Sequence, residues 1–209
     1  MAATIRTILF DMGNVLLHFS HPRMCEQLGL LCGRTQDELH QQLITSGRQL
    51  DFERGHYSAA GFHEWFQSLS AEPIDLLRLR HSAADIFELN TPMLPILDGL
   101  KRHGYRLVLL SNTSVYHFEH VRENYDVLDR FDAYVLSYEA NALKPEPAIF
   151  EAALRVIDCA PPECFYTDDI PAYVEAGRSH GLDAEVFTTP EALTQHFTDR
   201  GVRWQNGVL

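Results

Sequence analysis

The sequence predicts an α/β protein: a doubly wound parallel sheet of the Rossmann-like type, with a small helical domain inserted after the first strand. Two observations carry this prediction. In the second half of the chain, short apolar runs that end abruptly in polar residues alternate with helical segments, as in strands joined by crossover helices. Residues 18–89 break the alternation, because they contain helical patterns and no convincing strand. We therefore expect a core domain of residues 1–17 and 90–209 and a helical domain of residues 18–89.

Five runs rich in Val, Ile, Leu, Phe or Tyr are the predicted strands of the core: Ile5–Phe10, Arg106–Ser111, Ala133–Ser137, Cys164–Thr167 and Ala184–Phe187. The apolar stripe from Met93 to Leu100 predicts a helix that ends in LKRHG, where basic residues suit the C-terminus and Gly104 suits the left-handed cap position. A second stripe runs from Ile149 to Ile157, and Pro147 suits its first turn. Two further helices are predicted over Ala172–His180 and Glu191–Phe197.

The inserted segment carries helix signals of its own. Thr35 and Glu38 form a capping box ahead of an apolar run. Ser58 is placed to cap the run that holds Trp65, and Leu76–Ile86 is again helix-like. The insert is therefore expected to be helical throughout.

Composition narrows the classes of function. The formal net charge of −12 argues against nucleic-acid binding, since phosphate backbones select basic faces. No apolar run approaches the roughly 18 residues of a membrane span, and the N-terminal apolar stretch is too short for a secretory signal. We therefore expect a cytoplasmic protein whose four cysteines are reduced thiols, mostly buried. His117 and His120, a close histidine pair, are interpreted as surface or packing residues.

Polar residues follow the predicted strands at their carboxyl ends, where open α/β sheets bind ligands. Lys144 lies in the loop after the third strand. Asp11, Asp168 and Asp169 would bring three carboxylates to this edge. Such carboxylates repel each other unless they share a cation, and oxygen ligands favour Mg²⁺. A phosphate dianion would be neutralised by this metal and by Lys144, while a hydroxyl donates a hydrogen bond. The residues concerned are Asp11, Ser111, Asn112, Lys144, Asp168 and Asp169.

Four segments, ILFDMGNV, LVLLSNT, LKPEPAIF and FYTDDI, follow one another in an order that resembles the haloacid dehalogenase-like hydrolase superfamily. The resemblance covers essentially the whole chain. It implies that residues 18–89 form a mobile cap over the site. The string DMGNV is similar to an Asp-x-Gly-Asn subgroup that includes a sugar 1-phosphate phosphatase. The implied function is a Mg²⁺-dependent phosphatase that acts on a small phosphorylated metabolite, such as a sugar phosphate.

The resemblance also implies how each position handles the phosphate. Asp11 attacks phosphorus and forms an aspartyl-phosphate, which water then hydrolyses. Lys144 holds the phosphoryl oxygens and offsets the charge of Asp11. Further phosphate contacts are implied for the Ser111 hydroxyl, for Asn112, chiefly through its backbone, and for the backbone amides of Met12 and Gly13.

The implied metal ligands are Asp11, the carbonyl of Gly13 and Asp169, with Asp168 acting beside them. Gly13 is also where the sequence departs from the usual pattern. Phosphatases of this superfamily carry an aspartate there, which protonates the leaving oxygen and later activates water. Losing that proton transfer removes a contribution of about 10²–10⁴-fold.

Three explanations of Gly13 are open. The substrate needs less help, as with the anomeric oxygen of a sugar 1-phosphate, which the subgroup favours. Another acid replaces the aspartate, with His18 the nearest candidate in the sequence. Or the chain is an impaired homologue that binds phosphate compounds without turnover. The glycine itself is interpreted as the requirement of a tight turn.

Other readings remain at this stage. A 2-haloacid dehalogenase also uses an aspartate and lacks the second one, but it works without metal and leaves Asp168 and Asp169 without a purpose. A closing cap would select the substrate. Its candidate substrate-facing residues are Phe52, Arg54, His56 and Trp65, and Arg48 and Arg54 could reach a second anionic group. The sequence gives no indication of the oligomeric state.

Overall fold

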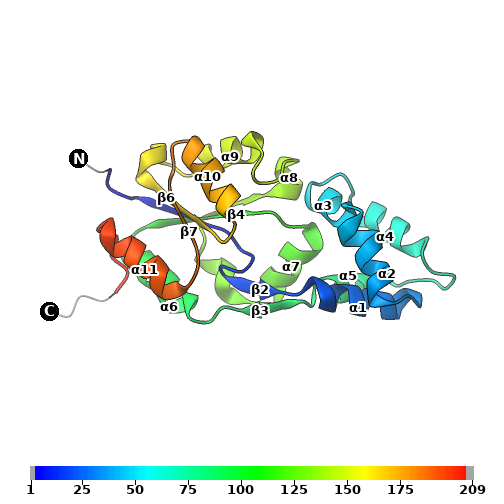
Figure 1. Ribbon diagram of the computed structural model, residues 1–209. Helices are drawn as coiled ribbons and strands as arrows, with labels where there is room; N and C mark the ends of the chain where they lie inside the picture. The colour runs from blue at the N-terminus through cyan, green and yellow to red at the C-terminus, as the bar shows by residue number, and fades with distance from the viewer. Residues whose placement is uncertain (1–2, 206–209) are drawn as a thin grey trace.

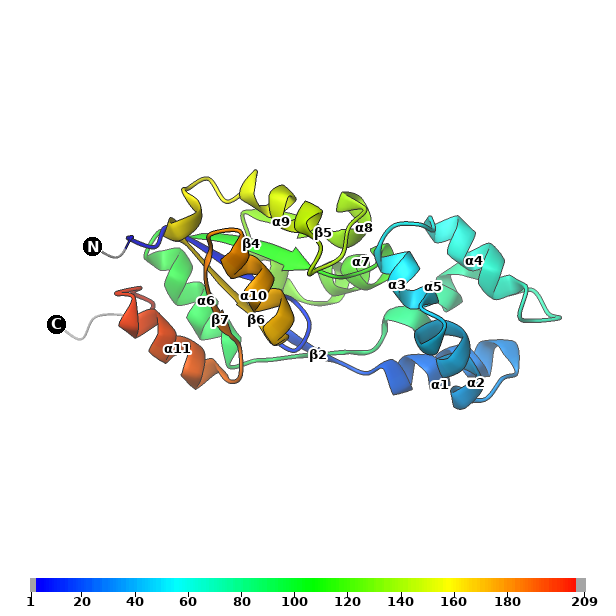
Figure 2. The same cartoon turned by 45° about the horizontal axis from the view of Figure 1, so that its top comes forward.

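The computed structural model describes residues 3–205, and within them the chain forms two parts (Figure 1). One part is built on a five-stranded parallel sheet with strand order β5-β4-β1-β6-β7. The other part, which we call the insert, comprises residues 17–89 and lies beyond one end of the sheet (Figures 1 and 2). The predicted fold class is confirmed.

The sheet and its helices form the core. In chain order its elements are β1 (Thr7–Phe10), α6 (Met93–Arg102), β4 (Arg106–Ser111), α7 (Val115–Asn124), η2 (Asp126–Arg130), β5 (Ala133–Leu136), α8 (Ser137–Ala140), α9 (Pro147–Leu154), η3 (Pro161–Glu163), β6 (Cys164–Asp168), α10 (Pro171–Ser179), β7 (Asp183–Val186) and α11 (Pro190–Asp199). The five predicted strands agree with these bounds to within one or two residues. Gly104 follows α6 with a φ of 82°, the left-handed conformation expected of it.

Helices cover both faces of the sheet. On β1, Ile8 and Phe10 point to the face that packs against α6, α7 and α11, while Leu9 points to the face under α9 and α10 (Figure 1). All these side chains are fully buried. The near-continuous apolar strands follow from this, because a parallel sheet covered on both sides has no solvent face.

The insert contains β2 (Leu17–Phe19), α1 (His21–Cys32), α2 (Gln36–His40), η1 (Gln41–Thr45), α3 (Arg48–Glu53), α4 (Ala59–Gln67), α5 (Leu76–Ala84) and β3 (Phe87–Leu89). The capping box of Thr35 and Glu38 forms as predicted, and Ser58 caps α4. The expectation that this segment holds no strand is wrong. Its two ends, β2 and β3, pair antiparallel and lead the chain out of the core and back. Each strand has only three residues, which is too short to give a periodic signal.

The insert contacts the core through α5, which packs on α7, and through α3 with the turn that follows it. Arg54 forms a two-pronged ion pair with Glu146, with Nη1 to Oε2 at 2.6 Å. The Ser137 hydroxyl donates to the carbonyl of Glu53 over 2.6 Å. Gly55 has a φ of 82°, and a Cβ on it would lie 2.3 Å from the carbonyl oxygen of Tyr138. The turn therefore sits directly on α8, and only glycine fits there.

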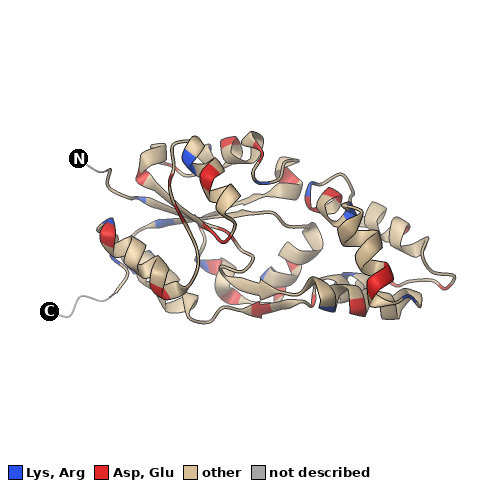
Figure 3. Ribbon diagram, in the orientation of Figure 1, with Lys and Arg blue, Asp and Glu red and all other residues tan. Residues whose placement is uncertain are grey.

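Charged residues of both signs are mixed over the described part of the chain. Lys and Arg positions are spread over both parts of residues 3–205 and alternate with acidic ones (Figure 3). Among the described helices, none has the length and apolar character that a membrane crossing requires. All four cysteines are free, and Cys25 and Cys164 are buried. His117 and His120 are buried, so these histidines are packing residues.

Helix α10 is predicted to be intolerant of a side chain at Gly177. A Cβ there would lie 2.6 Å from the ring of Tyr166, whose hydroxyl donates to Asp168 over 2.6 Å. We expect Gly177→Ala to lower the free energy of unfolding by about 1–3 kcal/mol, because overpacking outweighs the gain in helix propensity. Urea denaturation measures this change. Ser179→Ala, on the exposed side of the same helix, is the control, and equal stability of the two variants would contradict the prediction.

Candidate active site

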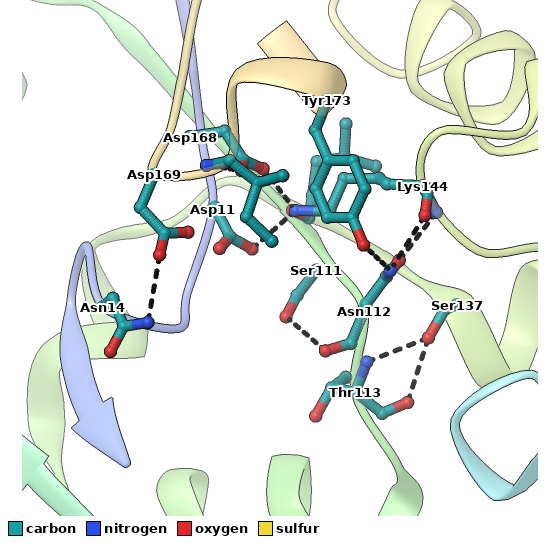
Figure 4. Close-up of polar contacts among 12 residues, drawn as sticks. Asp11, Asn14, Ser111, Asn112, Thr113, Ser137, Lys144, Asp168, Asp169 and Tyr173 are labelled. Carbon is teal, nitrogen blue, oxygen red and sulfur yellow. Dashed lines mark hydrogen bonds and ion pairs between the residues drawn. The ribbon is translucent and has the colours of Figure 1, made fainter. Parts of the chain in front are cut away.

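The register of the sheet brings three strand ends to one level. Phe10 pairs with Leu109 of β4 and with Thr167 of β6. Asp11 therefore leaves β1 beside Asp168 at the end of β6. The loop after β5 brings Lys144 to the same place (Figure 4). Residues distant in sequence thus converge where the two sides of the sheet wind in opposite directions.

The Lys144 ammonium is the centre of this cluster. Its Nζ donates to Asp11 Oδ1 over 2.7 Å, to Asp168 Oδ2 over 2.6 Å and to the carbonyl of Leu110 over 3.0 Å. The side chain is 1% exposed, so its charge is compensated almost entirely by these groups. All three protons of the ammonium are used. The ring of Tyr173 packs over it, with 5.3 Å from Nζ to the ring centroid.

The two aspartates after β6 have different surroundings. Asp168 is fully buried, and its carboxylate accepts hydrogen bonds from Tyr166 over 2.6 Å and from the Ile170 amide over 2.9 Å, besides Lys144. Asp169 is half-buried and accepts only from the Asn14 side chain, over 3.0 Å, among the residues that the structure describes. Asp169 therefore has oxygens free for a ligand, whereas Asp168 serves to hold its neighbours.

Asp11, Asp168 and Asp169 form a cluster that could hold a metal ion, with one oxygen of each within 4.8 Å of the others. The turn between Asp11 and β2 adds an oxygen. Its hydrogen bonds end on the carbonyls of Met12 and Leu17, which leaves the Gly13 carbonyl outside the pairing. These donors are all hard oxygens, a set that suits Mg²⁺.

The loop after β4 fixes the position of Lys144. The Asn112 side chain accepts from the Lys144 amide over 2.8 Å and donates to its carbonyl over 3.2 Å. Its side chain is therefore occupied, and its backbone is what can face a ligand. Ser111 lies at the end of β4 and is 1% exposed, and its hydroxyl lies 3.4 Å from the carbonyl of Asn112 (Figure 4).

A cavity of about 170 Å³ lies over the cluster, between the core and the insert. From the core it is lined by Asp11, Met12, Gly13, Asn14, Asn112, Thr113, His117, Lys144, Asp169, Ile170 and Tyr173. From the insert it is lined by Phe19, His21, Leu50, Glu53 and Phe87. Among the described residues, Lys144 is the only Lys or Arg in this lining.

Comparison with known proteins agrees with this arrangement. The model of the haloacid dehalogenase-like hydrolase family matches residues 5–181. The chain belongs to this family of hydrolases. It is 26% identical over 190 residues to D-ribitol-5-phosphate phosphatase of Bacteroides thetaiotaomicron, covering 86% of this chain and 90% of the relative. The family predicted from the four motifs is thus confirmed.

Solved structures of a HAD family enzyme from the same bacterium are similar throughout. One superposes with a TM-score of 0.81 at 26% identity and covers 93% of this chain and 98% of that chain. Another, a complex with magnesium and inorganic phosphate, has a TM-score of 0.73 at 26% identity, covering 88% of this chain and 94% of that one. The haloacid dehalogenase-like fold therefore extends over both the core and the insert.

Gly13, two positions after Asp11, lies beside the ring of Phe19, which is 37% exposed. The φ of Gly13 lies outside the left-handed region, so the expectation that a tight turn requires glycine is wrong. A Cβ on Gly13 would instead lie 2.9 Å from the ring of Phe19, which occupies the space beside Asp11. An aspartate at this position would displace that ring.

Several sequence candidates lie elsewhere. His18 is exposed on β2 and does not line the cavity. Arg54 is paired with Glu146, and Arg48 stacks on Trp65, with 4.5 Å from its guanidinium carbon to the ring centroid. Phe52 and His56 also lie outside the lining; Phe52 stacks on Phe62 and His56 lies near Asp51.

Sequence analysis missed six polar residues of the lining: Asn14, His21, Glu53, Thr113, His117 and Tyr173. Asn14 was within reach of sequence analysis, since it belongs to the DMGNV string. Glu53, His21 and Tyr173 reach the cavity only through the docking of α3, α1 and α10, which no local pattern reports.

Charge and burial act against each other in the cluster. Burial raises the pKa of Asp11 to about 7, although the Lys144 ammonium lowers it. Burial also opposes the charge on Lys144, but Asp11 and Asp168 outweigh this and raise its pKa. Lys144 is therefore the fixed charge of the site, and the ionisation of Asp11 depends on its neighbours.

Stability is predicted to fall in mild acid because of His117, which joins α7 to the insert. Its Nε2 lies 3.2 Å from the Ala83 carbonyl, and burial lowers its pKa from 6.5 to about 4. Between these values the unfolded chain binds the extra proton, so the stabilisation is lost as the pH falls. From about pH 7 to pH 5 we expect His117→Gln to lose about 2 kcal/mol less than the wild type in urea unfolding. The exposed His18→Gln is the control and should follow the wild type; parallel curves for all three proteins would refute the prediction.

Proposed function

We propose that this hydrolase is a Mg²⁺-dependent phosphomonoesterase that acts on a small hydroxylated metabolite through an aspartyl-phosphate on Asp11. One observation carries the proposal: Asp11 lies at the bottom of the cavity, held by a buried ammonium and next to a cluster of oxygen ligands. A carboxylate that is oriented but still accessible is suited to attack phosphorus. The phosphatase relative supports the same reaction.

The metal is assigned to three ligands. Asp11, Asp169 and the Gly13 carbonyl would hold Mg²⁺, and the solved relative that contains magnesium and phosphate supports this choice of ion. When bound, the ion neutralises charge on the phosphoryl group. Asp168, whose oxygens are occupied by its neighbours, positions Lys144 and acts on the metal only indirectly.

The remaining core residues bind the phosphoryl group. Met12, Gly13 and Asn112 line the cavity, and we assign the contacts to the amides of Met12 and Gly13 and to the backbone of Asn112. Lys144 offsets the charge of Asp11 and of the incoming phosphate. Ser111 is buried at the end of β4, next to the lining residue Asn112, and its hydroxyl is assigned a further contact to a phosphoryl oxygen.

The substrate is assigned a single phosphate and a hydroxylated body. A second phosphate or carboxylate would meet no further cation, and it would face the carboxyl group of Glu53. The rings of Phe19 and Phe87 offer apolar surface to the carbon skeleton. The relative's name, a phosphatase of D-ribitol 5-phosphate, supports a sugar or sugar alcohol phosphate.

The insert is assigned the role of a cap. With residues 18–89 as the cap domain and residues 1–17 and 90–209 as the core domain, the β2–β3 pair is the connection about which the cap moves. The contacts of α3 with α8 describe the closed state, which keeps bulk water away from the aspartyl-phosphate.

Replacement of the nucleophile tests this function. Asp11→Asn is expected to reduce phosphate release to background in a panel of phosphomonoesters with Mg²⁺, because the amide cannot form the aspartyl-phosphate. Chelation with EDTA should abolish wild-type release, and Mg²⁺ should restore it. Equal rates for wild type and Asp11→Asn would favour a binding module without turnover, and halide release from a 2-haloacid in EDTA would favour a dehalogenase.

Asn14 is predicted to set the affinity for the metal through Asp169. Its amide orients that carboxylate over 3.0 Å, and loss of such a contact typically weakens metal binding by about 10–100-fold. Because Asn14 has a φ of 54°, Asn14→Gly keeps the backbone conformation. We expect a half-saturating Mg²⁺ concentration raised by this factor, with kcat recovered at high Mg²⁺. Asp158→Gly, at another left-handed position outside the cavity lining, is the control; an unchanged Mg²⁺ dependence of Asn14→Gly would exclude the role.

A further inference from the structure

The cavity has a floor and a roof. The floor is the edge of the sheet with Asp11, and the roof is the part of the insert that lines the cavity. In phosphoryl transfer the attacking and leaving oxygens lie roughly in line with phosphorus. A monoester attacked by Asp11 from the floor therefore turns its leaving oxygen toward the roof.

Among the described residues of the floor, the Tyr173 hydroxyl has a pKa raised by burial, and no carboxyl group is free to give that oxygen a proton. Gly13 has no side chain, and Phe19 fills the space that a carboxyl group would need. Both oxygens of Asp168 accept hydrogen bonds, and Asp169 belongs to the metal cluster. The Lys144 ammonium is held by Asp11 and Asp168, which raise its pKa and keep it charged. A donor has to come from the roof.

Glu53, the last residue of α3, is placed for this purpose. Glu53 is one of the residues that line the cavity, and it is 9% exposed. One oxygen, Oε1, accepts from the Gln49 amide over 2.9 Å, which orients the carboxyl group. Its backbone carbonyl is tied to the core by the Ser137 hydroxyl, and the next residue is the Arg54 of the ion pair with Glu146. The carboxyl group is thus held at a fixed place when the insert is docked.

We propose that Glu53 is the general acid and base of the reaction, replacing from the insert the carboxyl group that Gly13 lacks. This inference rests on the proposed phosphatase function. It also replaces two earlier explanations of Gly13, since it requires neither a substrate with an easy leaving group nor the loss of turnover.

The proton transfers balance over the two steps. In the first, an Asp11 oxygen bonds to phosphorus, the bond from phosphorus to the substrate oxygen breaks with its electron pair on that oxygen, and protonated Glu53 supplies the proton of the released alcohol. In the second, water attacks phosphorus and gives its proton to the Glu53 carboxylate. The bond from phosphorus to Asp11 breaks, the carboxylate of Asp11 returns, and Glu53 is again protonated.

Burial and a hydrogen bond act in opposite directions on the protonation of Glu53. Burial raises its pKa to about 7, and the hydrogen bond from Gln49 lowers it in opposition. Tyr173, which packs over Lys144, lines the same cavity as Glu53. The other titratable or charged groups that line the cavity are Asp11, His21, His117, Lys144, Asp169 and Tyr173.

The histidines are weaker candidates for the same task. Burial lowers the pKa of both His21 and His117, so each is short of the proton that an acid must give. His117 is also committed to the Ala83 carbonyl, and the ring of His21 packs against Phe19 at 5.0 Å between centroids. Because His21 belongs to the roof as Glu53 does, a variant of His21 is part of the experiment.

The decisive experiment compares Glu53→Gln with the wild type on two substrates. With a polyol phosphate, whose leaving oxygen needs a proton, we expect kcat to fall by about 10²–10⁴-fold. With p-nitrophenyl phosphate, whose leaving group departs as an anion, rapid mixing should show a burst of one equivalent of nitrophenolate at the wild-type rate. Slow turnover follows, because only hydrolysis of the aspartyl-phosphate still needs the base. The accumulated phosphoenzyme is measured by mass spectrometry after an acid quench.

Three variants make the outcome interpretable. Glu64→Gln, exposed on α4 of the same insert, should behave as wild type. Glu53→Asp keeps a carboxyl group and should recover part of the lost rate. His21→Gln should retain most activity on both substrates. Circular dichroism establishes that each variant is folded.

Different failures overturn different claims. A burst rate that falls as far as the turnover of the polyol phosphate would make Glu53 structural, and wild-type rates in Glu53→Gln would remove its role altogether. The burst pattern in His21→Gln instead would transfer the role to His21. A wild-type protein that forms no phosphoenzyme with either substrate would overturn the phosphatase function, and the assignment of Glu53 with it.

Discussion

The buried ammonium of Lys144 is the interaction on which the rest of the site depends. It lies between Asp11 and Asp168 in a chain of net charge −12, and its side chain is 1% exposed. Without it, carboxylates at the ends of β1 and β6 would face each other in a desolvated place, and removing one partner of such a buried group typically costs about 3–5 kcal/mol. The parallel register that aligns these two strand ends is therefore tied to the cation from the loop after β5.

In this arrangement Asp168 supports Lys144, whereas Asp169 is open to a ligand. Asp168 spends its oxygens on Lys144, Tyr166 and the Ile170 amide, so it can fix the ammonium but offers little to a ligand. Asp169, one residue later, is held by a single amide and stays open toward the cavity. Adjacent aspartates thus differ because one ends a strand inside the sheet and the other begins the loop outside it.

The ends of the strands and the docking of the insert determine how much of the fold and of the site the sequence alone predicts. Apolar runs ending in Asp11, Ser111 and the Asp168–Asp169 pair predict the strands and the edge of the sheet where the side chains meet, because parallel strands share that edge. The strands β2 and β3 escape such analysis, since three residues show no period and their pairing joins positions about 70 residues apart in sequence. Glu53 escapes it as well, because its place follows from how α3 docks on α8 and from no pattern within α3. The same docking takes Arg54 out of the cavity, although the sequence suggested the opposite.

The position of an acid on the insert has a consequence that an acid beside Asp11 would not have. Glu53 reaches the cavity because α3 is held by the Ser137 hydroxyl and by the ion pair of Arg54 with Glu146. Glu146 in turn lies two residues after Lys144, so the contact that closes the insert bears on the loop that carries the ammonium. In the proposed mechanism, movement of the insert leaves Asp11 in place but removes the proton donor together with α3. Cleavage of the ester is then possible only in the closed state, and that state is also the one that excludes bulk water from the aspartyl-phosphate. Closure and proton transfer become one event, which compensates for a core that has given the space beside its nucleophile to Phe19.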